Sequence, residues 1–291
     1  MDWLTNFKIP IGPLAKEGVN WLTSNGKGVF DFLKVFLQAG IDAVLFVLQG
    51  PFAGGGDGNL AYALFIIVLV TALAWYFRRS VGVAAFTFVG LLLIVNQGYW
   101  KETTETLALV LAATGVSMVV GVPLGIAAAR RPWFYAVLRP ILDLMQTIPT
   151  FVYLIPALIL FGLGMVPGLI ATVIFAIPAP IRLTRLGIIS TPPSLVEAAQ
   201  AFGATPSQVL RKVELPFAMP QIMAGLTQTI MLSLSMVVIA ALVGAKGLGV
   251  PVVRALNTVN ISMGFEAGLC IVILAIILDR LFRAPDEGDA A

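Results

Sequence analysis

Seven long apolar runs constrain this chain more than any other feature of its sequence. A helix needs about 20 apolar residues to cross the roughly 30 Å hydrocarbon core of a bilayer, with its backbone groups hydrogen-bonded inside the segment. The runs are Leu60 to Phe77, Val81 to Val95 extending to Tyr99, Leu107 to Ala129, Leu138 to Gly162, Met165 to Ile188, Ile222 to Val243 and Ile261 to Leu281. They predict an all-α integral membrane protein with about seven transmembrane helices.

The composition excludes most soluble and enzymatic classes. Of the 291 residues, 59% are hydrophobic and 11% are charged, against roughly 25% charged residues in a soluble domain. The chain has no histidine and one cysteine, Cys270, so it lacks the parts for a Ser/His/Asp triad, a His or Cys metal site or an intrachain disulfide. The net charge of +3 is too small and too regularly placed to indicate nucleic-acid binding.

Lysine and arginine residues near the ends of the runs predict the orientation, because cytoplasmic connections carry the excess of positive charge. With the N-terminus outside, only Lys101, Lys246 and Arg254 fall on outer connections close to a span. The inner side then carries Arg78, Arg79, Arg130, Arg131, Arg139, Arg182, Arg185, Arg211, Lys212, Arg280 and Arg283. Seven spans would place the C-terminus inside.

The chain divides into three regions. Residues 1–59 are predicted to be a periplasmic or interfacial region, with an amphipathic helix at 30–49 and a flexible connection from Pro51 to Gly58. Residues 60–283 form the transmembrane domain, which includes a polar cytoplasmic loop at 190–220, and residues 284–291 form an acidic tail. An eighth span at 30–49 is the alternative, although it would place two aspartates and a lysine in lipid.

The loop at 190–220 is predicted to contain two short helices joined at a glycine corner. Two residue pairs have the spacing of a helix capping box: Ser194 with Glu197, and Thr205 with Gln208. Gly203 would end the first helix in the left-handed conformation, and Pro216 would stop the second. A short helix with a small-residue surface suits docking into the groove of a partner. The alternative is a loop that packs on its own membrane domain.

This loop resembles the EAA-x3-G-x9-[IV]-x-LP signature of the membrane subunits of bacterial ATP-binding-cassette importers. The matching residues are Glu197, Ala198, Ala199, Gly203, Val213, Leu215 and Pro216. Residues 146–164, 181–188 and 217–249 are also similar to the permeases of glycine betaine, proline betaine and choline importers. The resemblance covers roughly Leu60 to Leu281 and implies the fold of a type I ABC importer permease.

The resemblance implies a permease subunit in the bacterial cytoplasmic (inner) membrane. In that family the EAA loop is a coupling helix seated in a cleft of a separate ATPase subunit, so ATP and Mg would bind to that partner and this chain would carry no cofactor. The other implied partners are a periplasmic or lipid-anchored substrate-binding protein, a second copy of the chain, and membrane lipids. The implied cargo is glycine betaine, proline betaine, choline or trimethylamine N-oxide.

Candidate pathway residues lie in the fourth, fifth and last runs. Proline frees backbone carbonyls that lipid cannot satisfy, so proline-rich helices are expected to line a cavity. Aromatic rings there could attract a cationic solute. The candidates are Phe151, Tyr153, Pro156, Phe161, Phe175 and Glu266. The alternative is that the aromatic side chains face lipid and the proline-rich helices are kinked packing helices.

Other functional classes remain open at this point. An importer permease for another small solute, such as an amino acid, would have the same architecture. A secondary transporter or channel would need an ion-coupling site, for which the runs offer only Asp143 and Glu266. Asp143 is expected to pair instead with Arg139, one helical turn earlier. A membrane-embedded enzyme would need a cluster of titratable groups, which the lack of histidine disfavours.

Overall fold

The computed structural model describes residues 10–50 and 60–283, and within these ranges it contains helices and turns but no strand. The predicted connection Pro51 to Gly58 and the acidic tail at 284–291 lie outside the described residues. The helices are α2 (Ile11–Asn25), α3 (Lys27–Gln49), α4 (Leu60–Arg78), α5 (Val81–Asn96), α6 (Trp100–Arg130), α7 (Pro132–Thr147), α8 (Thr150–Phe161), α9 (Met165–Ala176), α10 (Pro178–Ile189), α11 (Pro193–Ala201), α12 (Pro206–Val209), the π-helical turn η1 (Leu210–Glu214), α13 (Leu215–Ala241), α14 (Gly249–Thr258) and α15 (Ile261–Phe282).

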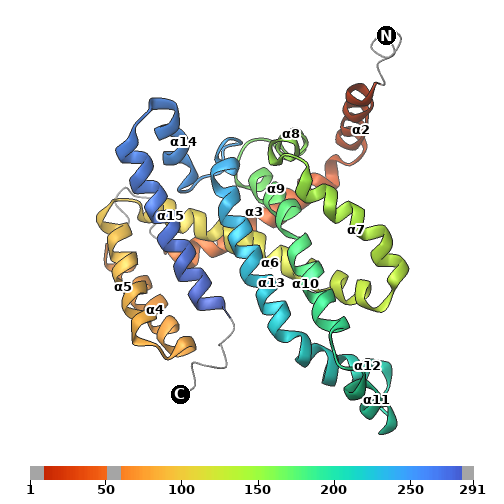
Figure 1. The fold of residues 1–291 in the computed structure, drawn as a ribbon. Helices are drawn as coiled ribbons and strands as arrows, with labels where there is room; N and C mark the ends of the chain where they lie inside the picture. Colours follow the sequence, from red (N-terminus) through yellow and green to blue (C-terminus); the bar gives the residue numbers. More distant parts are fainter. Residues whose placement is uncertain (1–9, 51–59, 284–291) are drawn as a thin grey trace, which may run out of the picture.

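Five segments of the described chain are long and apolar enough to cross a membrane, and each overlaps a predicted run. They are Leu60–Arg78, Trp100–Arg130, Met165–Ile189, Pro206–Ala241 and Ile261–Phe282. Helix α5 is apolar but has only 16 residues, fewer than the roughly 20 that a straight span needs. Helices α11 and α12 project from one end of the molecule, and α14 lies at the opposite end (Figure 1).

The prediction of one continuous span from Leu138 to Gly162 is wrong. This run is broken into α7 and α8, which meet at 96° and would together make a sixth span. Pro149 lies at the break and holds Ile148 in an extended conformation (ψ 132°). The Tyr153 hydroxyl lies 2.8 Å from the carbonyl oxygen of Met145, which the end of α7 leaves without a helical partner.

Small residues let the helices at the centre of the molecule approach closely. A Cβ atom on Gly125 of α6 would lie 2.7 Å from the carbonyl oxygen of Ile181 and 2.7 Å from Cβ of Thr184, both on α10. Gly187 of α10 similarly faces Ala218 of α13. Membrane helices gain little from hydrophobic burial against each other, so such close contacts provide much of the attraction between them.

Helix α3 covers the segment for which an amphipathic helix is predicted. Its buried residues are Leu37, Ile41 and Leu48, all of which belong to the predicted apolar face. Phe30, which also belongs to the predicted apolar face, packs edge to face on Phe161 of α8, with ring centroids 5.5 Å apart. Helix α3 is therefore packed on the bundle along one face; its position at the membrane interface stays a prediction.

Candidate functional site

Residues 193–216, which carry the signature, form a compact projection that we call the EAA segment. It consists of α11, a glycine corner, α12 and the turn η1, and it leads directly into α13. Gly203 has φ +78°, as predicted for the corner. The Gly203 amide donates to the carbonyl of Gln200 (2.8 Å) and the Ala204 amide to the carbonyl of Ala199 (3.0 Å). This pair of bonds is the Schellman arrangement, which satisfies carbonyls at the end of α11.

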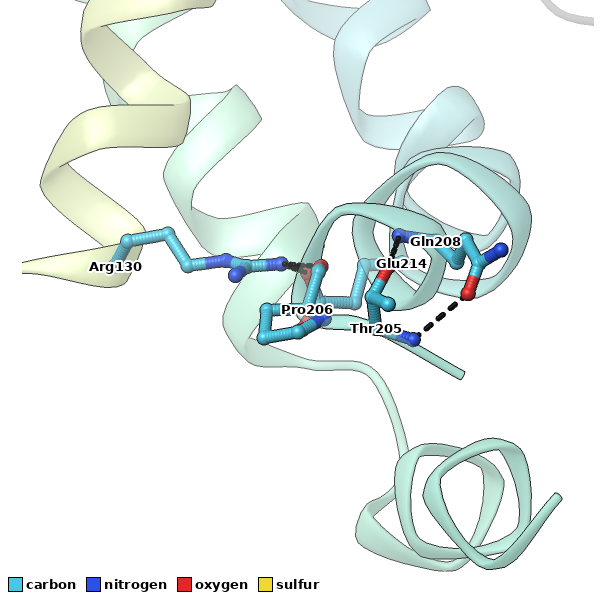
Figure 2. A network of polar contacts seen from close by, with 5 residues as sticks. All are labelled: Arg130, Thr205, Pro206, Gln208 and Glu214. Atoms are coloured by element: carbon cyan, nitrogen blue, oxygen red, sulfur yellow. Dashed lines mark hydrogen bonds and ion pairs between the residues drawn. The ribbon is translucent and has the colours of Figure 1, made fainter. Parts of the chain in front are cut away.

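The second helix of the EAA segment begins with the predicted capping box. The Gln208 amide donates to Oγ1 of Thr205 (3.4 Å), and the Thr205 amide donates to Oε1 of Gln208 (2.8 Å; Figure 2). The predicted box at Ser194 is wrong, because α11 begins at Pro193 and Pro192 occupies the cap position. Proline is favoured at the first helical position, where its missing N–H costs nothing. Ser194 is consequently already inside the helix.

The prediction that Pro216 ends a helix is also wrong. The chain is helical without interruption from Pro206 to Ala241 and passes through the π-turn Leu210–Glu214 just before the proline. A proline ring would clash with the carbonyl four residues earlier in a regular α-helix. The wider π-turn relieves this clash. The second half of the EAA segment, from Pro206 onwards, is therefore an extension of a membrane helix rather than a separate loop.

An arginine from the end of α6 anchors the EAA segment. The Arg130 guanidinium donates to a carboxylate oxygen of Glu214 (2.6 Å) and to the carbonyl oxygen of Pro206 (3.2 Å; Figure 2). It therefore links α6, the start of α12 and the end of η1. The sequence did not indicate this contact, because Arg130 and Glu214 are 84 residues apart.

The outer face of the EAA segment is unusually open. Helix α11 has no buried residue, and Glu197 and Ala198 are exposed while Ala199 is half-buried. Phe202, beside the glycine corner, is 94% exposed. The sequence analysis missed Phe202, although a large apolar residue at a polar helix corner is a recognisable signal. An exposed aromatic residue at the tip of a rigid projection is typical of an interaction surface.

The last signature residues have a different environment. Val213 and Leu215 are half-buried, and Leu215 packs on the buried cluster of Ile188, Ala218 and Ile222. Pro216 is exposed. The signature thus joins an exposed half on α11 to a half that is packed on the membrane helices.

The structure does not gather the six candidate pathway residues into one site. Tyr153 and Phe175 pack on the same buried cluster. Phe161 is buried against α3, Phe151 is exposed, and Pro156 is half-buried inside α8. Glu266 accepts a hydrogen bond from Ser262 (3.0 Å). None of the six lines the apolar cavity of about 1020 Å³ that is formed mainly by α4, α6, α13 and α15 of the described chain.

The carboxylate of Asp143 is paired, but not with the expected partner. Arg182 of α10 lies 2.5 Å from it, in place of Arg139 on its own helix. The neighbouring Arg185 lies over the ring of Tyr135 on α7, with 3.6 Å between the guanidinium carbon and the ring centroid. Both arginines therefore attach α10 to α7.

Comparison with known proteins identifies the family of this chain. Residues 121–287 match the family described as binding-protein-dependent transport system inner membrane component. The chain belongs to this family. As such an inner membrane component, it is a multi-pass protein of the inner membrane, and the resemblance to ABC importer permeases seen in the sequence is confirmed.

Two relatives share most of the length of this inner membrane component. The glycine betaine transport system permease protein OpuAB of Bacillus subtilis is 45% identical over 274 residues, which cover 94% of this chain and 93% of the relative. The glycine betaine/proline betaine transport system permease protein ProW of Escherichia coli is 43% identical over 279 residues, covering 95% and 75%.

A solved structure has the same fold. It is the MetNI methionine ABC transporter in an inward-facing conformation, with a TM-score of 0.57 and 25% identity over 65% of this chain and 92% of the solved one. The predicted fold, that of a type I ABC importer permease, is confirmed.

Proposed function

We propose that this inner membrane component is the permease subunit of an ATP-binding-cassette importer for a quaternary or methylated amine such as glycine betaine, proline betaine, choline or trimethylamine N-oxide. Two relatives are named as permeases for glycine betaine or proline betaine, which supports this cargo. Residues 146–164, 181–188 and 217–249 resemble permeases of the same kind. Two copies of the chain would enclose the pathway. A separate binding protein would deliver the solute from outside, and separate ATPase subunits would bind ATP and Mg.

The EAA segment is the proposed docking site for the ATPase. The observation that carries this proposal is that α11 bears Glu197, Ala198 and Ala199 yet has no buried residue. The capped corner at Gly203 and the capping box at Thr205 make the projection rigid without help from a partner. A preorganised surface binds without a large ordering cost. Phe202 is the expected anchor of this contact.

Reconstitution tests the proposed function directly. The permease, its ATPase and its binding protein in proteoliposomes are expected to accumulate radiolabelled glycine betaine only when ATP is supplied. Unlabelled choline or proline betaine should compete if the importer accepts them. Accumulation without ATP would favour a secondary transporter, and competition by methionine alone would favour an amino-acid permease.

The proposed orientation has its own test. Cysteine placed at exposed Gln208 should react with a membrane-impermeant thiol reagent only after the membrane is opened, and cysteine at exposed Asn257 of α14 should react from outside. Both variants belong in a Cys270→Ala background, although Cys270 itself is fully buried. The physical reason is the excess of arginine on the side of Gln208. Labelling of Gln208 from outside would contradict both the orientation and the docking site.

A further inference from the structure

A small cavity with charged lining residues lies beside α14. Helix α14 is at the end of the molecule opposite to α11 and α12 (Figure 1). The cavity has a volume of about 300 Å³ and is formed by the start of α6, the turn before α14, α14 itself and the start of α15. Its aromatic and charged lining residues are Tyr99, Lys101, Glu102, Glu105, Lys246 and Arg254. Residues that are far apart in the sequence therefore bring charges of both signs to one place.

The charges around this cavity are not paired with one another. The two ion pairs formed within residues 10–50 and 60–283 lie elsewhere, at Arg130–Glu214 and Arg182–Asp143. The three basic residues that line the cavity are the same three that the sequence assigns to outer connections near a span. The fold therefore gathers these three basic residues at one cavity.

Neither carboxylate of the cavity forms an ion pair within the described part of the chain. Glu105 is only 7% exposed, and Glu102 is half-buried. One carboxylate oxygen of Glu102 is also buried and unpartnered among the described residues. Buried carboxylates are costly unless a cation or a donor accompanies them. Together with the three basic residues, these carboxylates give the cavity charges of both signs that form no ion pair within the described part of the chain.

Contacts within the protein hold the walls of the cavity in place. The Leu248 amide donates to Oγ1 of Thr106 on α6 (2.8 Å). A Cβ atom on Gly247 would lie 2.5 Å from the same oxygen, so the turn that carries Lys246 lies directly on α6. Burial raises the pKa of the Tyr99 phenol, which stays neutral at pH 7.

We propose that this cavity is a binding site of the permease itself for a small zwitterion with a quaternary ammonium group at one end and a carboxylate at the other. The proposal rests on the proposed function and adds to it a solute site within this chain. A quaternary ammonium group has no N–H to donate, so it is held by carboxylate charge and by aromatic faces, here Glu102, Glu105 and Tyr99. Lysine and arginine hold the carboxylate. A volume of about 300 Å³ suits only a small solute.

Binding of glycine betaine to the purified full-length permease, without any binding protein, tests this site. Calorimetric titration should show saturable binding that becomes at least about tenfold weaker in Glu105→Gln and in Arg254→Gln, since each loses one charged contact. Glu17→Gln makes the same chemical change on the exposed surface of α2 and should not alter the binding constant. Absence of saturable binding to the unmodified protein would overturn the proposal.

Two analogues test the same site without any substitution. Choline lacks the carboxylate, and 3,3-dimethylbutyrate replaces the quaternary nitrogen by carbon and so lacks the positive charge. Each should bind at least about tenfold more weakly than glycine betaine, because each leaves one set of charges unpaired. Equal binding of all three would overturn the zwitterion site.

The outcome can be separated from that of the proposed function. ATP-driven uptake by the reconstituted complex, without solute binding to the permease alone, would overturn the zwitterion site and leave the importer intact. If Glu105→Gln then also weakened binding of the binding protein to the permease, the cavity would belong to that docking surface instead. Absence of uptake by the unmodified complex would overturn the proposed function itself.

Discussion

Gly203→Val is expected to leave the protein inserted in the membrane, to weaken its copurification with the ATPase at least about tenfold and to abolish uptake. The backbone at Gly203 has φ +78°, which costs a non-glycine residue roughly 1 kcal/mol and a β-branched residue more. No atom of the described chain lies within 4 Å of the site of a Cβ atom there. A valine Cβ atom would therefore meet nothing inside the described permease, and the side chain would project where the ATPase is proposed to dock.

Gly98→Val is a closely matched control for this experiment. Gly98 also has φ +78°, has no atom within 4 Å of its Cβ position and ends a helix with the same pair of bonds, from Gly98 to Val95 and from Tyr99 to Ile94. The Gly98→Val substitution introduces the same backbone strain away from the EAA segment, and this variant should copurify normally with the ATPase. Copurification and uptake that survive in Gly203→Val would show that the EAA segment is not the docking site.

Gly125→Val is expected to prevent the permease from folding. Its Cβ atom would lie 2.7 Å from both a backbone oxygen and a side-chain carbon of α10, and neither belongs to a flexible side-chain end. Forcing α6 and α10 apart should cost about 3 kcal/mol or more, at the upper end of overpacking effects. The yield of monodisperse protein after detergent extraction, and its thermal unfolding midpoint, would measure this loss.

Gly115→Val is the control on the same helix. Gly115 is exposed, and nothing lies within 4 Å of its Cβ position, so the substitution adds the same side chain without a contact. Its yield and unfolding midpoint should match those of the unmodified protein. Equal behaviour of both variants would mean that α6 and α10 are not packed as closely as the structure has them.

The long apolar runs predicted the membrane helices well, because lipid leaves a chain few alternatives. The run from Leu60 to Phe77 became α4 within one residue of its predicted end. The break in the run from Leu138 to Gly162 was harder to predict. That run contains Pro140, Pro149 and Pro156, yet only Pro149 breaks it, while the other two lie inside α7 and α8. The presence of a proline alone therefore does not predict where the run breaks.

The spacing of neighbouring residues predicted the exposed half of the EAA segment, but it did not predict the contacts that fix this segment to the rest of the protein. The corner at Gly203 and the box at Thr205 depend on neighbouring residues, so the sequence could reveal them. The contact of Arg130 with Glu214 joins segments that meet only in three dimensions. The same is true of the cavity near α14, which Glu105 and Lys246 both line. Charges that the sequence could count only as orientation signals are brought together by the fold.

The continuous helix from Pro206 to Ala241 would act as a lever, with the second half of the EAA segment at one end. Its 36 residues span about 50 Å. The closest contacts with α10, at Ala218 and Gly225, lie near its middle and provide a fulcrum. A tilt of about 10° around that point would move Pro206 by roughly 5 Å on one side and swing Ala241 the opposite way. The end of the bundle that carries α14 and its cavity would then move as well, without any helix having to unwind.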